Sequence, residues 1–178
     1  MKSRRYAVKS MMLGTAAAAM APKARAASKG VAQFVERWDK AKAFTLQVAD
    51  AMPADAYTYK PKPEMRSYGE LMGHIATNNA FYVSRFKGGE LPDNLRPPKE
   101  FDKDTVKTYL TASFDFCADV IKGLNEDALD KSYPGRPNTP ALTGWDWVLY
   151  AFIHTAHHRG YADVYLREKG ITPPRYSV

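Results

Sequence analysis

Apolar residues recur at intervals of three and four in four stretches of the chain, which is the period of one face of an α-helix. The first stretch lies between residues 31 and 52, and Pro53 ends it because proline cannot continue a helix. Its apolar stripe consists of Val31, Phe34, Val35, Trp38, Ala41, Thr45, Val48 and Met52. We therefore predict an amphipathic helix that ends at Pro53.

The second predicted helix begins at Ser67. Ser67 and Glu70 have the spacing of a capping box, in which the two side chains bond free amides of the first turn. Gly88 and Gly89 are typical of the end of a helix. The inward stripe consists of Leu71, His74, Ile75, Asn78, either Phe81 or Tyr82, and Phe86.

Two further helices are predicted, from about Asp104 to Leu124 and from Thr143 or Gly144 to Lys169, before Gly170. The third stripe consists of Val106, Leu110, Phe114, Cys117, Ile121 and Leu124. The stripe of the last helix consists of Trp147, either Tyr150 or Ala151, His154, His158, either Tyr161 or Ala162, and Tyr165. Because the single cysteine lies on a stripe, we interpret it as a small buried residue rather than a reactive thiol.

Proline-containing segments separate the predicted helices, at residues 53–66, 90–100 and 125–143. The last of these is the longest segment without a pattern, and such loops often have a function. We find no alternating strand pattern of useful length, no internal repeat and no second domain. Four helices of about 20 residues, each about 30 Å long, predict an all-α fold, a four-helix bundle.

The N-terminal residues 1–26 have the pattern of a secretory signal peptide. Basic residues come first, an apolar run follows over residues 10–21, and Ala24-Arg25-Ala26 ends the segment as a cleavage site. The start resembles a twin-arginine export signal, but Ala7 stands where a phenylalanine is usual. We predict cleavage after Ala26, a bundle domain over residues 27–178, and a periplasmic or secreted protein.

The net charge of +7 gives little support to a nucleic-acid partner. Six basic residues and no acidic ones lie within residues 1–26, so the rest of the chain has a net charge of only +1. A nearly neutral domain has no electrostatic footprint for phosphate. One cysteine excludes an intramolecular disulfide and a cysteine-rich metal site. No segment after the signal peptide has the roughly 20 apolar residues of a membrane span.

The histidines are the strongest indication of chemistry. His154 and His158 are four residues apart, so their side chains lie about 5–6 Å apart on one helix face and can share a metal ion. His74, on the inward face of another helix, can supply the third ligand, whereas His157 points elsewhere. Three nitrogen ligands leave an open position for water or substrate, which is typical of catalytic metal sites. The alternative is that these are core histidines with hydrogen-bond partners.

Several more specific catalytic and binding motifs are excluded. Residues 154–158 have the two outer histidines of a metalloprotease helix, but Thr155 stands where the catalytic glutamate would be. Gly88-Gly89 is too short to form a phosphate-binding loop, and no nucleophile elbow is present. The catalytic residues themselves are unknown from the sequence.

Three neighbours of the histidines have two interpretations each. Asn78 lies one turn beyond His74, and Tyr161 one turn beyond His158; either orients a ligand or simply packs in the bundle. Arg159 either attracts an anionic substrate or is a structural arginine.

Two segments around the histidines resemble the DinB-like family. Residues 67–76, SYGELMGHIA, resemble its first histidine motif, and residues 152–160, FIHTAHHRG, resemble its second. The segments at 61–64, 165–167 and 170–174 are also typical of the family. The resemblance covers essentially the whole chain after the signal peptide.

The resemblance implies a four-helix bundle with an up-up-down-down course and a divalent metal on His74, His154 and His158. Characterised relatives include thiol-dependent S-transferases and a maleylpyruvate isomerase that uses a small thiol. Relatives often pair through helix faces, which implies a homodimer. Small thiols are mainly cytoplasmic, so the predicted export argues against a thiol-transfer role.

We therefore expect a metal-dependent enzyme that activates water or a thiol, of transferase, hydrolase or isomerase type, acting on a small molecule. The metal is zinc, nickel or iron, since imidazole suits each of them. The first alternative is a bundle that binds a metal or small molecule without turnover. The second is a structural protein whose histidines are core polar residues.

Overall fold

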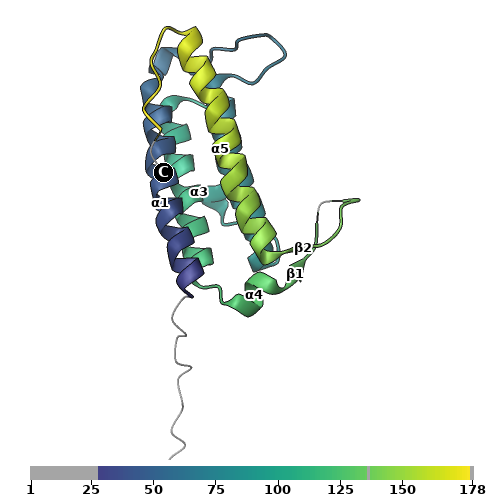
Figure 1. Cartoon of the computed structure of the whole chain (residues 1–178). Helices are drawn as coiled ribbons and strands as arrows, with labels where there is room; N and C mark the ends of the chain where they lie inside the picture. The colour runs from purple at the N-terminus through teal and green to yellow at the C-terminus, as the bar shows by residue number, and fades with distance from the viewer. Residues whose placement is uncertain (1–27, 136, 177–178) are drawn as a thin grey trace, which may run out of the picture.

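The computed structural model describes residues 28–135 and 137–176, and four long helices dominate them (Figure 1). The all-α prediction is confirmed. The predicted signal peptide lies outside the described residues. The long helices are α1 (Lys29–Ala51), α2 (Tyr68–Val83), α3 (Lys103–Lys122) and α5 (Gly144–Glu168). Within the described part of the chain, none of the helices is both long enough and apolar enough to cross a membrane.

The predicted capping box at Ser67 is confirmed, and a second box, not predicted, precedes α5. The Ser67 side chain accepts a hydrogen bond from the Glu70 amide, the Glu70 carboxylate accepts one from the Ser67 amide, and Thr143 and Asp146 form the same box before α5. The second helix is shorter than predicted, because after Val83 the chain tightens into a 3₁₀ helix, η2 (Ser84–Lys87), and then turns at Gly88 with φ of 72°.

Several short elements in the connections have no counterpart in the sequence pattern. Residues 125–143, expected to be without regular structure, contain a short helix and a two-strand antiparallel pair. Elements this short do not establish a period that a sequence pattern can show. These elements are η1 (Ala54–Ala56), η3 (Asp93–Leu95), α4 (Glu126–Asp130), β1 (Ser132–Tyr133) and β2 (Leu142–Thr143).

Contacts between helix ends establish the direction of α1, α2 and α3. The start of α2 lies at the end of α1, where the Tyr68 hydroxyl donates to the Val48 carbonyl at 2.6 Å. The start of α3 lies there too, because Lys103 Nζ donates to the Asp50 carbonyl at 2.7 Å. Both helices therefore run antiparallel to α1 and parallel to each other.

Helix α5 runs opposite to α2, since the Tyr165 hydroxyl near its end donates to the Arg66 carbonyl just before α2. The directions along the chain are therefore up, down, down, up, which differs from the predicted up-up-down-down course. Segment 52–67 joins adjacent helix ends, whereas segment 84–102 returns the chain along the bundle before α3 starts. The two segments have similar lengths, so the physical reason lies in tertiary contacts: the second segment packs against α3, where the Tyr109 hydroxyl donates to the Leu95 carbonyl at 3.2 Å.

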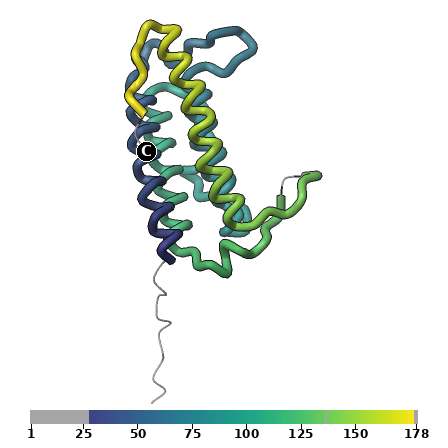
Figure 2. Tube along the Cα trace, viewed as in Figure 1, coloured from purple at the N-terminus to yellow at the C-terminus, as the bar shows by residue number. Residues whose placement is uncertain are grey.

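The core lies between the four helices and is rich in aromatic rings. Trp38 is fully buried, donates its indole N–H to the Phe114 carbonyl at 3.0 Å, and packs against Phe34, Phe114 and Phe152. The C-terminal segment folds back along α1 (Figure 2), where the Tyr176 ring meets Phe44 with centroids 5.5 Å apart.

Gly69 allows the segment before α3 to approach α2 closely. A Cβ at Gly69 would lie 2.0 Å from the backbone oxygen of Phe101, a distance that backbone movement alone can relieve. We expect Gly69→Ala to lower the free energy of unfolding by about 1–3 kcal/mol, the usual cost of overpacking. Urea unfolding followed by circular dichroism measures this change.

Gly160→Ala is the matched control for that substitution. Gly160 is also helical, but a Cβ there would meet no described atom within 4 Å. Since alanine is the better helix former by about 1 kcal/mol, Gly160→Ala is expected to stabilise the protein slightly. Equal stability changes for the two variants would contradict the close approach at Gly69.

Candidate metal centre

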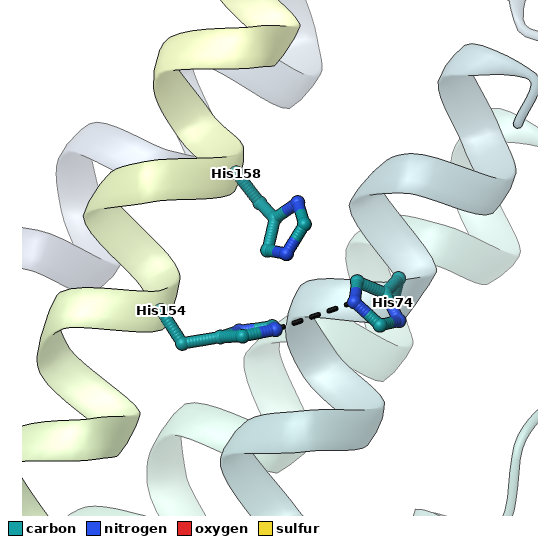
Figure 3. A group of neighbouring side chains, drawn as sticks. All are labelled: His74, His154 and His158. Carbon is teal, nitrogen blue, oxygen red and sulfur yellow. Dashed lines mark hydrogen bonds between the residues drawn. The ribbon is translucent and has the colours of Figure 1, made fainter. Parts of the chain in front are cut away.

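The structure brings His74, His154 and His158 together at the seam between α2 and α5 (Figure 3). One ring nitrogen from each residue lies within 4.8 Å of the other two, a geometry that could hold a metal ion. His154 Nε2 and His74 Nε2 are 3.3 Å apart, and the ring centroids of His154 and His158 are 4.3 Å apart. All three side chains are half-buried.

A buried polar pair beside the histidines holds the register of the two helices. The Thr155 hydroxyl donates to Asn79 Oδ1 at 2.9 Å, and both residues are almost completely buried. Thr155 follows His154 directly, and Asn79 lies five residues after His74. Because a slip of α5 along α2 would break this buried bond, the pair favours the register in which the rings converge.

The electrostatics favour a neutral His158. Partial burial, together with smaller effects of the nearby His74, His157 and Arg66, lowers the pKa of His158 to about 4. A neutral imidazole retains a lone pair, and metals bind that form. The donor set therefore suits a divalent transition metal near neutral pH.

Asn78 contacts His74 directly, which supports the orienting role over plain packing. Its side-chain nitrogen lies 3.0 Å from His74 Nδ1 and also donates to the His74 carbonyl at 3.0 Å. His74 Nε2 is the nitrogen that faces the other histidines, as Figure 3 shows. Metal binding at Nε2 requires the ring proton on Nδ1, and Asn78 can accept a hydrogen bond from that proton only through Oδ1.

Removing this contact is expected to weaken metal binding. We expect Asn78→Ala to raise the dissociation constant for Zn²⁺ about 10–100-fold, the usual effect of losing a group that orients a metal-bound histidine. Calorimetric titration of metal-free protein measures it. Asn78→Asp supplies an acceptor for an Nδ1 proton and should bind at least as tightly as Asn78→Ala. Wild-type affinity in Asn78→Ala would show that Asn78 only packs.

The neighbouring residues His157 and Tyr161 of α5 contact the His158 ring from outside the group of three converging rings. His157 is exposed and stacks edge-on against Tyr161, so it lies outside the cluster as predicted. Tyr161 is itself 47% exposed and contacts His158 through its ring, with centroids 6.0 Å apart. Tyr161 therefore forms part of the wall of the hollow beside His158.

Arg159 is a structural arginine. Its side chain is 4% exposed, points towards α1, and donates from Nη1 to the Thr45 hydroxyl at 3.1 Å. The guanidinium also lies over the Phe44 ring at 4.5 Å. Of the two interpretations, the anion-attracting role therefore has no support.

Cys117 is also structural. It is fully buried, its Sγ lies 3.3 Å from the Asn79 carbonyl, and burial raises the pKa of the thiol well above its usual value. A protonated thiol is a poor nucleophile and a poor metal ligand.

Two hollows flank the histidines and share a wall. One, of about 420 Å³, is lined by His74 and Thr77, and the other, of about 580 Å³, by His158 and Tyr161. Both are bounded by residues 64–66 of the loop before α2. The sequence analysis did not identify Glu64 or Arg66 as site residues, because a proline-containing loop has no period that indicates which side chains face a neighbouring helix.

Comparison with known proteins shows similarity along most of the chain. The family model described as the DinB superfamily matches residues 37–162. An uncharacterised protein, YjoA from Bacillus subtilis, is 28% identical over 148 residues, which cover 79% of this chain and 91% of that protein.

Solved structures show the same fold. The crystal structure of YjoA, a DinB-like protein, has a TM-score of 0.66 at 25% identity, covering 81% of this chain and 96% of that one. A DinB-like protein from Bacillus cereus has a TM-score of 0.69 at 16% identity, with 81% and 95% covered. A conserved protein from Enterococcus faecalis has a TM-score of 0.64 at 19% identity, with 79% and 97% covered.

Proposed function

The chain belongs to the DinB superfamily, and from that premise we propose that it is a metalloenzyme whose divalent ion is bound by His74, His154 and His158. The observation that carries the proposal is the convergence of three ring nitrogens from two helices within 4.8 Å. Zinc, nickel and iron all suit a three-imidazole donor set. Three protein ligands leave room for a further ligand, the arrangement of catalytic rather than structural sites.

The proposed catalytic chemistry depends on an open coordination position of the metal ion, beside the two hollows that flank the histidines. When bound, the ion supplies a Lewis acid that lowers the pKa of a water or thiol, and this supports a transferase, hydrolase or isomerase reaction. Asn78 orients the His74 ring through its contact with Nδ1. Arg66 places a positive charge beside His158, where it attracts an anionic group of a small substrate. The nearly neutral charge after residue 26 favours a small molecule over a nucleic acid.

Metal analysis combined with an activity screen tests the proposal. Purified protein is expected to contain about one divalent ion per chain, as a single three-ligand site requires. Activity should be screened with a low-molecular-weight thiol and an alkyl halide, and with an activated ester. A chelator should remove both metal and activity, and adding the metal should restore both. Protein that binds no metal after reloading would overturn the proposal.

A binding protein without turnover is the second candidate. Among the described residues, the group able to hold a metal consists of histidines and includes no carboxylate, so no acidic ligand doubles as a proton acceptor. This candidate predicts stoichiometric metal without reaction of any compound in the screen.

We also propose that the protein is exported, on the sequence pattern of residues 1–26. When the full chain is expressed in a bacterium with a twin-arginine system, the mature protein is expected in the periplasmic fraction, beginning at Ala27. Replacing Arg4 and Arg5 together with lysine should retain the uncleaved chain in the cytoplasm, because the positive charge alone is not the signal. N-terminal sequencing of fractionated protein measures this. Cytoplasmic wild-type protein with its N-terminus intact would contradict export.

A further inference from the structure

An aromatic recess lies beside the histidines, at the opposite end of the α2–α5 seam from Arg66. It has a volume of about 360 Å³ and is lined by Tyr82 of α2, Trp147 and Tyr150 of α5, and the segment just before α5. Ligand pockets of roughly 300–1,000 Å³ are common, and their linings are mainly apolar and aromatic. This recess is at the lower end of that range.

Three rings form a preorganised wall of the recess. The ring centroids are 5.9 Å apart for Tyr82 and Trp147, 5.9 Å for Tyr82 and Tyr150, and 6.2 Å for Trp147 and Tyr150. Favourable aromatic pairs have such separations. Tyr82 and Trp147 are buried, whereas Tyr150 is 50% exposed. A further ring entering the recess would find three partners already in place.

The Trp147 indole supplies a polar group for recognition. Its N–H is buried and has no hydrogen-bond partner among the residues that the structure describes. The indole of Trp38, which is equally buried, donates to the Phe114 carbonyl instead. A buried donor without an acceptor is costly, so a small movement of the indole that brings its N–H to an acceptor on a bound ligand would recover that cost.

The recess is next to the candidate metal centre. The Tyr82 ring that forms its wall also meets the His154 ring, with centroids 5.5 Å apart. Tyr150 lies one turn before His154 on α5, so both side chains project from the same face. A group in the recess therefore contacts the same Tyr82 ring that His154 contacts.

We infer that the recess binds an uncharged aromatic group carrying a hydrogen-bond acceptor, and that this group belongs to the substrate of the metal centre. Of these two statements, only the second rests on the proposed function. Among the described residues, no charged side chain lines the recess, and the Arg85 guanidinium lies over the Trp147 ring, 5.2 Å from its centroid, without being part of the lining. An uncharged group therefore suits the recess, because a charged one would lose hydration on entering it. The substrate class is thus an aromatic compound whose reactive part extends from the recess towards the histidines.

Titration with acetophenone, which has an aromatic ring and a carbonyl acceptor, tests the recess on metal-free protein. In ¹⁵N-labelled protein, the Trp147 indole signal, assigned with Trp147→Phe, is expected to shift saturably. Cyclohexyl methyl ketone keeps the acceptor without the ring and should bind more weakly. Tyr150→Ala should weaken acetophenone binding up to about tenfold, since an aromatic pair contributes about 0.5–1.5 kcal/mol.

Tyr161→Ala is the matched control, because Tyr161 is 47% exposed on the same helix but lines a different hollow. It should leave acetophenone affinity within about twofold, a change well below the value of an aromatic pair. The recess assignment is overturned if the Trp147 signal does not shift saturably, or if Tyr150→Ala and Tyr161→Ala have the same effect.

Paramagnetic Co²⁺ tests the connection to the metal centre. In Co²⁺-loaded protein, the acetophenone protons are expected to relax faster than in Zn²⁺-loaded protein, and Tyr150→Ala should reduce the difference. Protein that binds Co²⁺ without this effect would overturn the substrate assignment while the metal centre stands. Protein that binds no Co²⁺ would overturn the metal proposal and the substrate assignment together. The acetophenone titration of metal-free protein would then still test whether the recess binds an aromatic group.

Discussion

Replacing His158 with alanine is expected to raise the dissociation constant for Zn²⁺ by more than about 100-fold, beyond the 10–100-fold effect of losing an orienting neighbour. The reason is that a three-ligand site becomes a two-ligand site, and two imidazoles rarely retain a divalent ion against water. His154→Ala and His74→Ala should have the same effect, although His74 comes from a different helix. Metal content after dialysis and calorimetric titration measure the loss.

His157→Ala is the matched control for the histidine series. His157 is the residue before His158 and has the same side chain, but it is exposed and lies outside the metal-capable group. It should retain wild-type metal content and affinity. Thermal unfolding of each metal-free variant separates a lost ligand from a lost fold. Wild-type metal binding in His158→Ala, or its loss in His157→Ala, would contradict the assigned ligands.

Replacing Trp38 with alanine is expected to lower the free energy of unfolding by about 3–5 kcal/mol, the usual cost of deleting a large buried aromatic side chain. Trp38 is fully buried, and its loss opens a cavity between Phe114 and Phe152. The indole hydrogen bond to the Phe114 carbonyl is lost as well, although that carbonyl keeps its helical bond within α3. Urea unfolding at a fixed metal concentration measures the change.

Trp145→Ala provides the comparison for Trp38→Ala. Trp145 is only partly buried and packs beside Gly30 at the start of α1, so its removal should cost clearly less. Trp38→Phe keeps part of the volume and should have an intermediate effect. If Trp38→Ala and Trp145→Ala lowered the free energy of unfolding equally, Trp38 would not lie at the centre of the core.

Local patterns predicted the long helices well because each pattern depends on residues close in sequence. The apolar period defined the faces of α1 and α3, and the Ser67–Glu70 box defined the start of α2. Where the pattern offered two residues for one inward position on α5, the structure buries the smaller ones, Ala151 and Ala162, and leaves Tyr150 and Tyr161 half-exposed. Small side chains at these positions allow a close approach of neighbouring helices.

The sequence by itself determined the four long helices and the pairing of His154 with His158, because helical spacing is a local property. That His74 joins this pair was a prediction from its inward position, and the family resemblance supported it. Only the tertiary structure decided the helix directions, the wall formed by Glu64 and Arg66, the turn of Arg159 towards α1, and the aromatic recess at Trp147. The physical reason is that these features depend on contacts between residues far apart in the chain, and no local pattern encodes them.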